Sequence, residues 1–358
     1  MEGFASLFAS VPDPRAANVR HSLTTVLFIA LAAVLCGAET CQDMADFGVS
    51  KFKLIKSLVP LPYGTPSHDV FSNVFRHIDP EAFERVFATF ASAFGKAISG
   101  VVAIDGKAVR GAYKRGDKAS PLHLVNVWAA DQHMVIGQRL APSRNEVKGA
   151  LEALACLSLQ GCMVTADALH CRADTAQAIL KTGADYALAL KNNQPTLLIQ
   201  AKAHIEAADE ADRAETSDVK VHDRTETRRA TVVAVADMAF PGVKAVAQLE
   251  SIRSQQNGQQ AQHVRHFLLS RQVSATALLQ IARTHWSIEN QLHWVLDVAF
   301  CEDAARNRKD HGPQNLSTLR KIALNLIRQH PDKASIRRKI KKAGWDDQFL
   351  ISMIGHMR

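Results

Sequence analysis

Two short apolar stretches that each end in an aspartate constrain the fold of this chain most. Val101–Ile104 is followed by Asp105, and Met163–Ala166 is followed by Asp167. Such largely apolar runs are typical of strands buried within a sheet. Because α/β proteins place ligands and chemistry at strand ends, the two aspartates are candidates for one shared site. A turn residue or helix cap is the alternative interpretation of each.

The elements around these aspartates follow an order that predicts a mixed α/β sheet. Helices are expected over 145–157 and 172–182, and the short turn at Asp131 favours antiparallel pairing of the early strands. Helices between later strands permit parallel crossovers. A ribonuclease-H-like fold uses this order. The expected strands are 101–104, 123–130, 135–140, 162–165 and 186–190.

The flanking segments predict a division into three parts. Residues 1–97 have helical periodicity, and residues 98–330 are expected to form the main α/β domain. Within it, about 195–273 is expected to be a mostly β insertion, followed by a helix from Ala275 to Val298. Residues 331–358 are expected to be a basic tail. The strands expected inside the insertion are 231–235, 243–249 and 263–269.

Charge and cysteine content restrict the class of protein. The net charge of +8 favours an anionic partner, and from Arg306 to Lys342 twelve basic residues oppose two acidic ones. A solvated helix face is the alternative for that run. The six cysteines form no C-x-x-C pair, and no export signal is visible near the start, so a cytoplasmic protein is expected. The apolar run Val26–Ala38 is shorter than the roughly 20 residues that span a membrane.

A third carboxylate, Glu289, borders the apolar stripe of the predicted helix 275–298. Three carboxylates without a matched Cys/His pattern suit a hard cation such as Mg²⁺ rather than zinc. Two such cations can activate the attacking oxygen and stabilise the leaving one during displacement at phosphorus. Without cations the carboxylates should repel each other, which raises their pKa values. An ordinary surface glutamate is the alternative, and Asp297, Glu302 and Asp303 are rival third carboxylates.

Four motifs surround the candidate carboxylates and the strand that ends at Leu190. They are Ala103-Ile-Asp105-Gly-Lys107-Ala-Val-Arg110-Gly111, Val164-Thr-Ala-Asp167-Ala168, Ala184-Asp-Tyr-Ala-Leu-Ala-Leu-Lys191-Asn-Asn-Gln194 and His285-Trp-Ser-Ile-Glu289-Asn290-Gln-Leu-His293-Trp294-Val-Leu-Asp297-Val. These motifs resemble the DDE transposases of bacterial insertion sequences, in the branch that includes the H-repeat-associated proteins. Pro12-Asp13-Pro14-Arg15 and the apolar helix after Ser22 are similar to that branch's N-terminal transposase-associated domain.

The resemblance implies a ribonuclease-H-like catalytic core in which Asp105, Asp167 and Glu289 bind metal and catalyse the reaction. It implies cleavage of DNA at element ends and transfer of the freed 3′-hydroxyl to target DNA. The expected cofactor is Mg²⁺, with Mn²⁺ as a substitute. The expected partner is double-stranded DNA, both terminal inverted repeats and target, bound by a homodimer associated with the bacterial nucleoid.

Twelve residues are candidates for DNA contacts. The wider transposase group often carries an arginine and a lysine around the last carboxylate, and His285 and Leu296 stand there instead. Arg283 and the downstream basic cluster are expected to supply phosphate contacts in their place. The alternative to DNA contact is a solvated turn for Lys107, Arg110 and Lys191. For Trp286 the alternative is packing in the core. The candidates are Lys107, Arg110, Lys191, Arg283, His285, Trp286, Asn290, Arg337, Arg338, Lys339, Lys341 and Lys342.

Two other functions stay open at this point. A transposase-derived protein that binds DNA without transposition activity would bind terminal repeats and give no metal-dependent product. A hydrolase of small phosphoesters would show a shallow salt dependence. A protein with about 6–10 phosphate contacts to DNA should lose roughly 10³–10⁵ in affinity between 50 and 200 mM salt.

Overall fold

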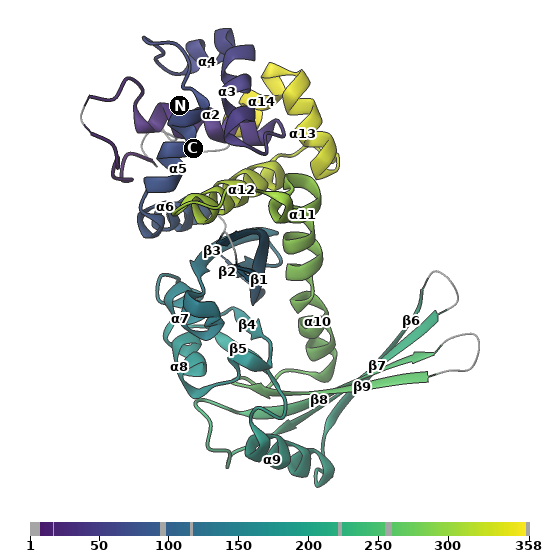
Figure 1. Ribbon diagram of the computed structural model, residues 1–358. Helices are drawn as coiled ribbons and strands as arrows, with labels where there is room; N and C mark the ends of the chain where they lie inside the picture. The colour runs from purple at the N-terminus through teal and green to yellow at the C-terminus, as the bar shows by residue number, and fades with distance from the viewer. Residues whose placement is uncertain are drawn as a thin grey trace.

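The computed structural model describes residues 8–16, 18–93, 98–114, 117–220, 224–254 and 260–355 (Figure 1). A mixed sheet runs through the described chain in the strand order β3-β2-β1-β4-β5-β9-β8-β7-β6. β1, β4 and β5 are parallel, and the other neighbours are antiparallel. The strands are β1 (Val101–Lys114), β2 (Asp117–Ala129), β3 (Met134–Leu140), β4 (Met163–Ala166), β5 (Asp185–Leu190), β6 (Asp212–Lys220), β7 (Arg224–Ala234), β8 (Ala245–Ser254) and β9 (Gln260–Leu269).

Helices cover both faces of this sheet, which confirms the predicted ribonuclease-H-like class. Val102 and Ile104 of β1 pack in the core on one face, and the alternate residue Ala103 packs in the core on the other. The first face is covered by α7 (Glu146–Leu154), α8 (Ala173–Lys181) and α9 (Pro195–Glu206). The second face is covered by α10 (Ala275–His285), the π-helix η3 (Ile288–His293), α11 (Trp294–Phe300) and α12 (Gly312–Gln329).

The first part of the chain is helical, as predicted. Ser22 caps the buried helix α2, and its side chain accepts a hydrogen bond from the backbone of Thr25. The N-terminal helices are α2 (Leu23–Leu35), α3 (Cys41–Ser50), α4 (Phe52–Leu58), α5 (His68–His77) and α6 (Pro80–Ala93). The 3₁₀ helices are η1 (Pro142–Arg144), η2 (Ala168–His170) and η4 (Glu302–Ala304).

The end of the chain folds back onto this helical block. α12 packs against α2, α5 and α6, and it is followed by α13 (Ile336–Trp345) and α14 (Asp347–Gly355), which also contact α2. Figure 1 shows the first and last helices together at one end of the molecule. Most of the basic segment after residue 330 is therefore helical. The division into three parts stays a prediction.

Two sequence-based boundaries were wrong. The first predicted strand does not end at Ile104, because β1 goes on pairing with β2 as far as Lys114, so Asp105 lies within the strand. The predicted helix 275–298 is interrupted by η3 between α10 and α11. Hydrophobic spacing does not distinguish a π turn from an α-helix over so few residues.

The segment 195–273 is mostly β, as predicted, but differs from the prediction in detail. It begins with the helix α9, whose first residue is a proline that fits a helix start. β6 was missed because its sequence is charged, yet it pairs along its whole length with β7, where Arg229 binds Glu215 at 2.6 Å. The strands expected at 231–235, 243–249 and 263–269 are longer than predicted and extend the central sheet. Figure 1 shows their outer ends projecting beyond α10.

Candidate active site

Asp105 and Asp167 lie on neighbouring strands at the point where parallel pairing ends. β1 and β4 pair up to Ile104 and Ala166, so the two aspartates are the next residues of each strand. Because Ala103 packs on the α10 side, Asp105 points toward that side as well. Asp167 also caps η2, with its Oδ1 accepting a hydrogen bond from the backbone N–H of Leu169 at 3.0 Å. The capping interpretation therefore holds for Asp167, and its side chain remains exposed.

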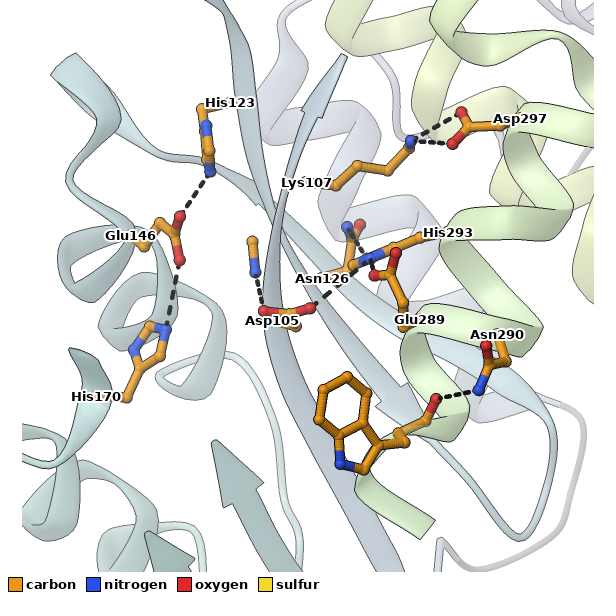
Figure 2. A network of polar contacts seen from close by, with 12 residues as sticks. Asp105, Lys107, His123, Asn126, Glu146, His170, Glu289, Asn290, His293 and Asp297 are labelled. Atoms are coloured by element: carbon orange, nitrogen blue, oxygen red, sulfur yellow. Dashed lines mark hydrogen bonds and ion pairs between the residues drawn. The ribbon is translucent and has the colours of Figure 1, made fainter. Parts of the chain in front are cut away.

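The π-helix η3 brings Glu289 to Asp105 together with a histidine that the sequence analysis did not select. His293 Nδ1 lies 2.9 Å from Glu289 Oε2 and 3.7 Å from Asp105 Oδ2. One ligand atom from each of the three residues lies within 4.8 Å of the others. Figure 2 shows the three side chains pointing toward one another from β1 and η3. Asp167 is not part of this compact group.

The buried amide of Asn126 contacts the Nε2 atom of the His293 imidazole. Asn126 Nδ2 lies 3.2 Å from His293 Nε2, and both residues are buried. Because an amide nitrogen only donates, Nε2 accepts in this arrangement, and Nδ1 carries the proton that it shares with Glu289. Burial lowers the pKa of His293, which favours the neutral ring. His293 follows Glu289 by four residues, and residues at that spacing are neighbours on a helix surface. This spacing is a sequence signal that could have identified the histidine.

The surroundings of Asp105 shift the pKa of its carboxyl group. Burial raises its pKa to about 7, and the carboxylates of Asp167, Glu146 and Glu289 act in the same direction. A hydrogen bond from the Gly106 N–H to Asp105 Oδ1, at 3.0 Å, opposes the rise. The predicted mutual repulsion of the carboxylates is therefore present at Asp105. A divalent cation would remove this repulsion.

Glu146, at the start of α7, is a further acidic residue that the sequence analysis missed. Its Oε1 accepts a hydrogen bond from His123 Nε2 at 2.6 Å, and its Oε2 lies 3.8 Å from His170 Nε2. The hydrogen bond from His123, with His170 nearby, lowers the pKa of Glu146 to about 2. The glycine after Asp105 is a possible sequence signal, because that glycine gives Glu146 room beside β1.

Lys107 and Arg110 follow Asp105 on β1 but face other acidic residues. Lys107 is 7% exposed, and its Nζ lies 2.8 Å from both carboxylate oxygens of Asp297. Arg110 has an exposed side chain whose Nε lies 3.5 Å from Asp303. Two of the rival third carboxylates thus pair with these cations. The third rival, Glu302, is fully buried and accepts a hydrogen bond from Ser317 at 2.7 Å.

His285 lies at the end of α10 and contacts β4 rather than solvent. Its Nδ1 is 3.0 Å from the hydroxyl of Thr165, two residues before Asp167. Burial lowers the pKa of His285 to about 4, so the ring is neutral near pH 7. Leu296, at the position where the wider group carries lysine, is fully buried. Neither side chain supplies a positive charge to the site.

Four of the predicted DNA contacts line one open groove beside the compact group. Its volume is about 1160 Å³, and it lies between β7–β9 and the segment from α10 to η3. The basic side chains of the sheet were not predicted from the sequence. Burial, together with repulsion from Arg228 and Arg253, lowers the pKa of Arg265. Trp286 is 54% exposed here. The predicted residues are Lys191, Arg283, Trp286 and Asn290, and the missed ones are Arg228, Arg253, His263 and Arg265.

Some of these groove cations already have acidic neighbours. Arg228 and Arg253 lie 3.0 and 3.6 Å from Glu226, and Arg283 lies 3.4 Å from Asp218. Lys191 is exposed at the end of β5. Asn290 donates to the backbone carbonyl of Trp286 at 3.2 Å and is the sequence neighbour of Glu289, so the groove borders the helical segment that carries Glu289.

The five basic candidates near the C-terminus lie on α13, in the helical block. Lys339 is buried and binds the carbonyls of Ile327 and His330, both at 2.9 Å. Lys342 pairs with Asp332 at 2.6 Å, and Arg337 donates to the carbonyl of Val298. Arg338 and Lys341 are exposed. Within this run, these two side chains are the most open to a phosphate.

Comparison with known proteins is consistent with this arrangement. The family model described as DDE_Tnp_1-associated matches residues 5–91, and the Transposase DDE domain matches residues 96–326. No helix among the described residues is both long and apolar enough to cross a membrane.

Curated relatives match over nearly the whole chain. The Escherichia coli O157:H7 protein named "Putative transposase YncI" is 32% identical, with 95% of this chain and 91% of the relative covered. The Escherichia coli K12 protein named "H repeat-associated putative transposase YhhI" is 31% identical, with 96% and 95% covered. The motifs, the mixed sheet and these matches agree. The chain therefore belongs to the DDE transposase family, in the branch of the H repeat-associated proteins.

Proposed function

We propose that this chain is a divalent-cation-dependent DNA transposase that cleaves DNA at element ends and joins the freed 3′-hydroxyl to target DNA. The observation that carries the proposal is the convergence of Asp105, Glu289 and His293 within 4.8 Å, with Asp167 on the adjacent strand. The family match supports it. The proposed catalytic and metal-binding residues are Asp105, Asp167 and Glu289.

The side chains present fit a divalent cation. Carboxylate oxygens suit Mg²⁺ and Mn²⁺, and an imidazole is compatible with Mn²⁺. Asn126 Oδ1 is buried and has no hydrogen-bond partner within the described part of the chain. Rotation of that amide would let Oδ1 accept from His293 Nε2–H and free the Nδ1 lone pair for a cation. Mg²⁺ is the proposed cofactor, with Mn²⁺ able to replace it.

Bound divalent cations supply Lewis acidity that stabilises the charge on the attacking and leaving oxygens at phosphorus. The protein's contribution is to fix the carboxylates on ordered elements, since Asp105 belongs to the paired strand β1, Asp167 caps η2 directly after β4, and Glu289 belongs to a largely buried helical segment. Before a cation binds, His293 and Asn126 hold Glu289 in place through hydrogen bonds. The group remains partly open, because Glu289 is 56% exposed, so a phosphodiester can reach it.

The groove supplies the proposed DNA contacts next to this site. Lys191 and Arg283 are placed to neutralise phosphates, and the exposed ring of Trp286 offers a surface on which an unpaired base can stack. The proposed substrates are double-stranded terminal inverted repeats and target DNA. A homodimer on paired ends is part of the proposal. Lys107 and His285 are assigned structural positions rather than phosphate contacts.

Strand cleavage of a duplex carrying the inverted repeats that flank the coding region tests the proposal. Wild-type protein should cleave in Mg²⁺ and not in EDTA, and Asp105→Asn, Asp167→Asn and Glu289→Gln should each abolish cleavage while repeat binding remains. Glu152→Gln, on the exposed side of α7, is the control and should cleave normally. Repeat binding by wild type without a metal-dependent product would instead identify a transposase-derived DNA-binding protein.

A further inference from the structure

A carboxylate outside the three family positions meets β1 directly beside Asp105. Glu146 begins α7, on the sheet face opposite α10. A Cβ added to Gly106 would lie 2.4 Å from its carboxylate carbon and 2.5 Å from each oxygen. Because Gly106 has no side chain, the Glu146 carboxylate reaches the strand at the residue whose N–H already binds Asp105. Figure 2 shows Asp105 between Glu146 on one side and Glu289 with His293 on the other.

Two histidines surround Glu146 in a way that keeps it ionised. His123 donates to Oε1 at 2.6 Å, and the side chains of both residues are less than one-fifth exposed. His170 is 1% exposed, its Nε2 faces Oε2 at 3.8 Å, and neither ring nitrogen has a hydrogen-bond partner among the described residues. A buried polar group without a partner costs about 1–3 kcal/mol. Among the described residues, the carboxylate of Glu146 is the acidic group that His170 Nε2 faces.

The turn that follows Asp167 joins this cluster to the active site. η2 has Asp167 as its N-cap and His170 as its last residue, so one short turn positions both. The charges of Asp167 and Glu146 both act on Asp105 and raise its pKa, and Asp105 also belongs to the compact group with Glu289 and His293. Four carboxylates carry a charge of about −4, which two divalent cations would balance.

We propose that Glu146 is a fourth acidic residue of the centre and holds a second divalent cation together with Asp105 and Asp167. The inference rests on the proposed function and extends its residue set. His123 and His170 act as positioning residues that fix the Glu146 carboxylate from the side away from Asp105. Gly106 is required because any side chain there would displace Glu146.

Titration of the full-length protein with Mn²⁺, read from the electron paramagnetic resonance signal of free Mn²⁺, tests this without an activity measurement. Wild type should bind two ions, Glu146→Gln and Glu289→Gln one each, and the control Glu152→Gln two. Two ions bound by Glu146→Gln with wild-type affinity would overturn the inference and leave the proposed function standing. No tight Mn²⁺ site in wild type would overturn both, and a single site in wild type would overturn only this inference.

A second variant covers the case in which Glu146→Gln does not fold. Glu146→Asp keeps the charge beside His123 but withdraws the carboxylate by one methylene. One of its two Mn²⁺ sites should weaken by at least about tenfold. Unchanged affinity at both sites would show that Glu146 serves only to pair with the two histidines.

Discussion

The Nδ1 atom of His293 lies 2.9 Å from Glu289 Oε2, one turn away on the same π-helix. The same nitrogen is 3.7 Å from Asp105 Oδ2 on β1. The histidine therefore links the last carboxylate to the first, and its position depends on Asn126 behind it. This link gives the first prediction.

Substitution of His293 should weaken cation binding more than it weakens folding. In His293→Gln, the site loses the Nδ1 atom that is proposed to bind the cation, so Mn²⁺ affinity should fall about 10–100-fold. Calorimetric titration with Mn²⁺ measures the change. His68→Gln, an exposed position on α5, should leave the affinity unchanged. Equal affinities for His293→Gln and wild type would exclude His293 from the site.

The raised pKa of Asp105 predicts a pH-dependent stability of the cation-free protein. Its folded-state pKa is about 7 against an ordinary value of 3.8, so the folded state binds the proton more tightly than the unfolded state does. The stabilisation is complete below about pH 4 and is lost as the pH rises through 7. Asp105→Asn does not titrate, so its stability relative to wild type should increase from pH 5 to pH 8. Thermal unfolding in EDTA measures this, and a constant difference across that range would contradict it.

Substituting Asp297 should lower the free energy of unfolding more than substituting its ion-pair partner Lys107. Asp297→Asn leaves a 7% exposed ammonium whose remaining ion pair among the described residues is with Asp303, at 3.5 Å, and should cost about 1–3 kcal/mol of unfolding free energy. Lys107→Met removes the buried charge and leaves the partly exposed Asp297 to water, so it should cost less. Urea unfolding measures both. The surface pair Lys148–Glu152 is the control, worth at most about 0.5 kcal/mol.

The groove and α13 make separable contributions to DNA binding. Lys191→Gln and Arg253→Gln should each weaken binding evenly across sequences and reduce the salt slope by about 1 per lost phosphate contact. The same measurement on Arg338→Gln and Lys341→Gln tests the exposed part of α13. Fluorescence anisotropy at several salt concentrations gives the slopes. Unchanged slopes in the groove variants would mean that DNA does not enter the groove.

Much of the sheet could be predicted because its central strands have strong local signals. The apolar runs before Asp105 and Asp167 and the cap at Ser22 identify elements on their own. β6 and the first residues of β9, 260–262, could not be predicted, because their exposed polar or charged side chains give no apolar pattern. They are strands because their backbones pair with the neighbouring strands β7 and β8.

The site was only partly predictable, because its geometry depends on residues from several elements. The motifs that carry Asp105, Asp167 and Glu289 can be recognised in the sequence, but the partners that orient them come from other elements. Asn126 belongs to β2 and Glu146 to α7, and only the sheet register and the glycine after Asp105 bring them close. Lys107 was expected to bind phosphate because its partner Asp297 lies 190 residues away in the sequence.

Cleavage of a terminal-repeat duplex that carries sulfur in place of the 3′-bridging oxygen at the scissile phosphate tests the central claim most directly. Sulfur binds Mn²⁺ better than Mg²⁺, because Mg²⁺ is the harder ion. If cations held by Asp105, Asp167 and Glu289 stabilise the leaving oxygen, cleavage should fail in Mg²⁺ and return in Mn²⁺, and the Asp105→Asn protein should cleave in neither. Equal cleavage of the modified duplex in Mg²⁺ and Mn²⁺, or cleavage by Asp105→Asn, would contradict the account.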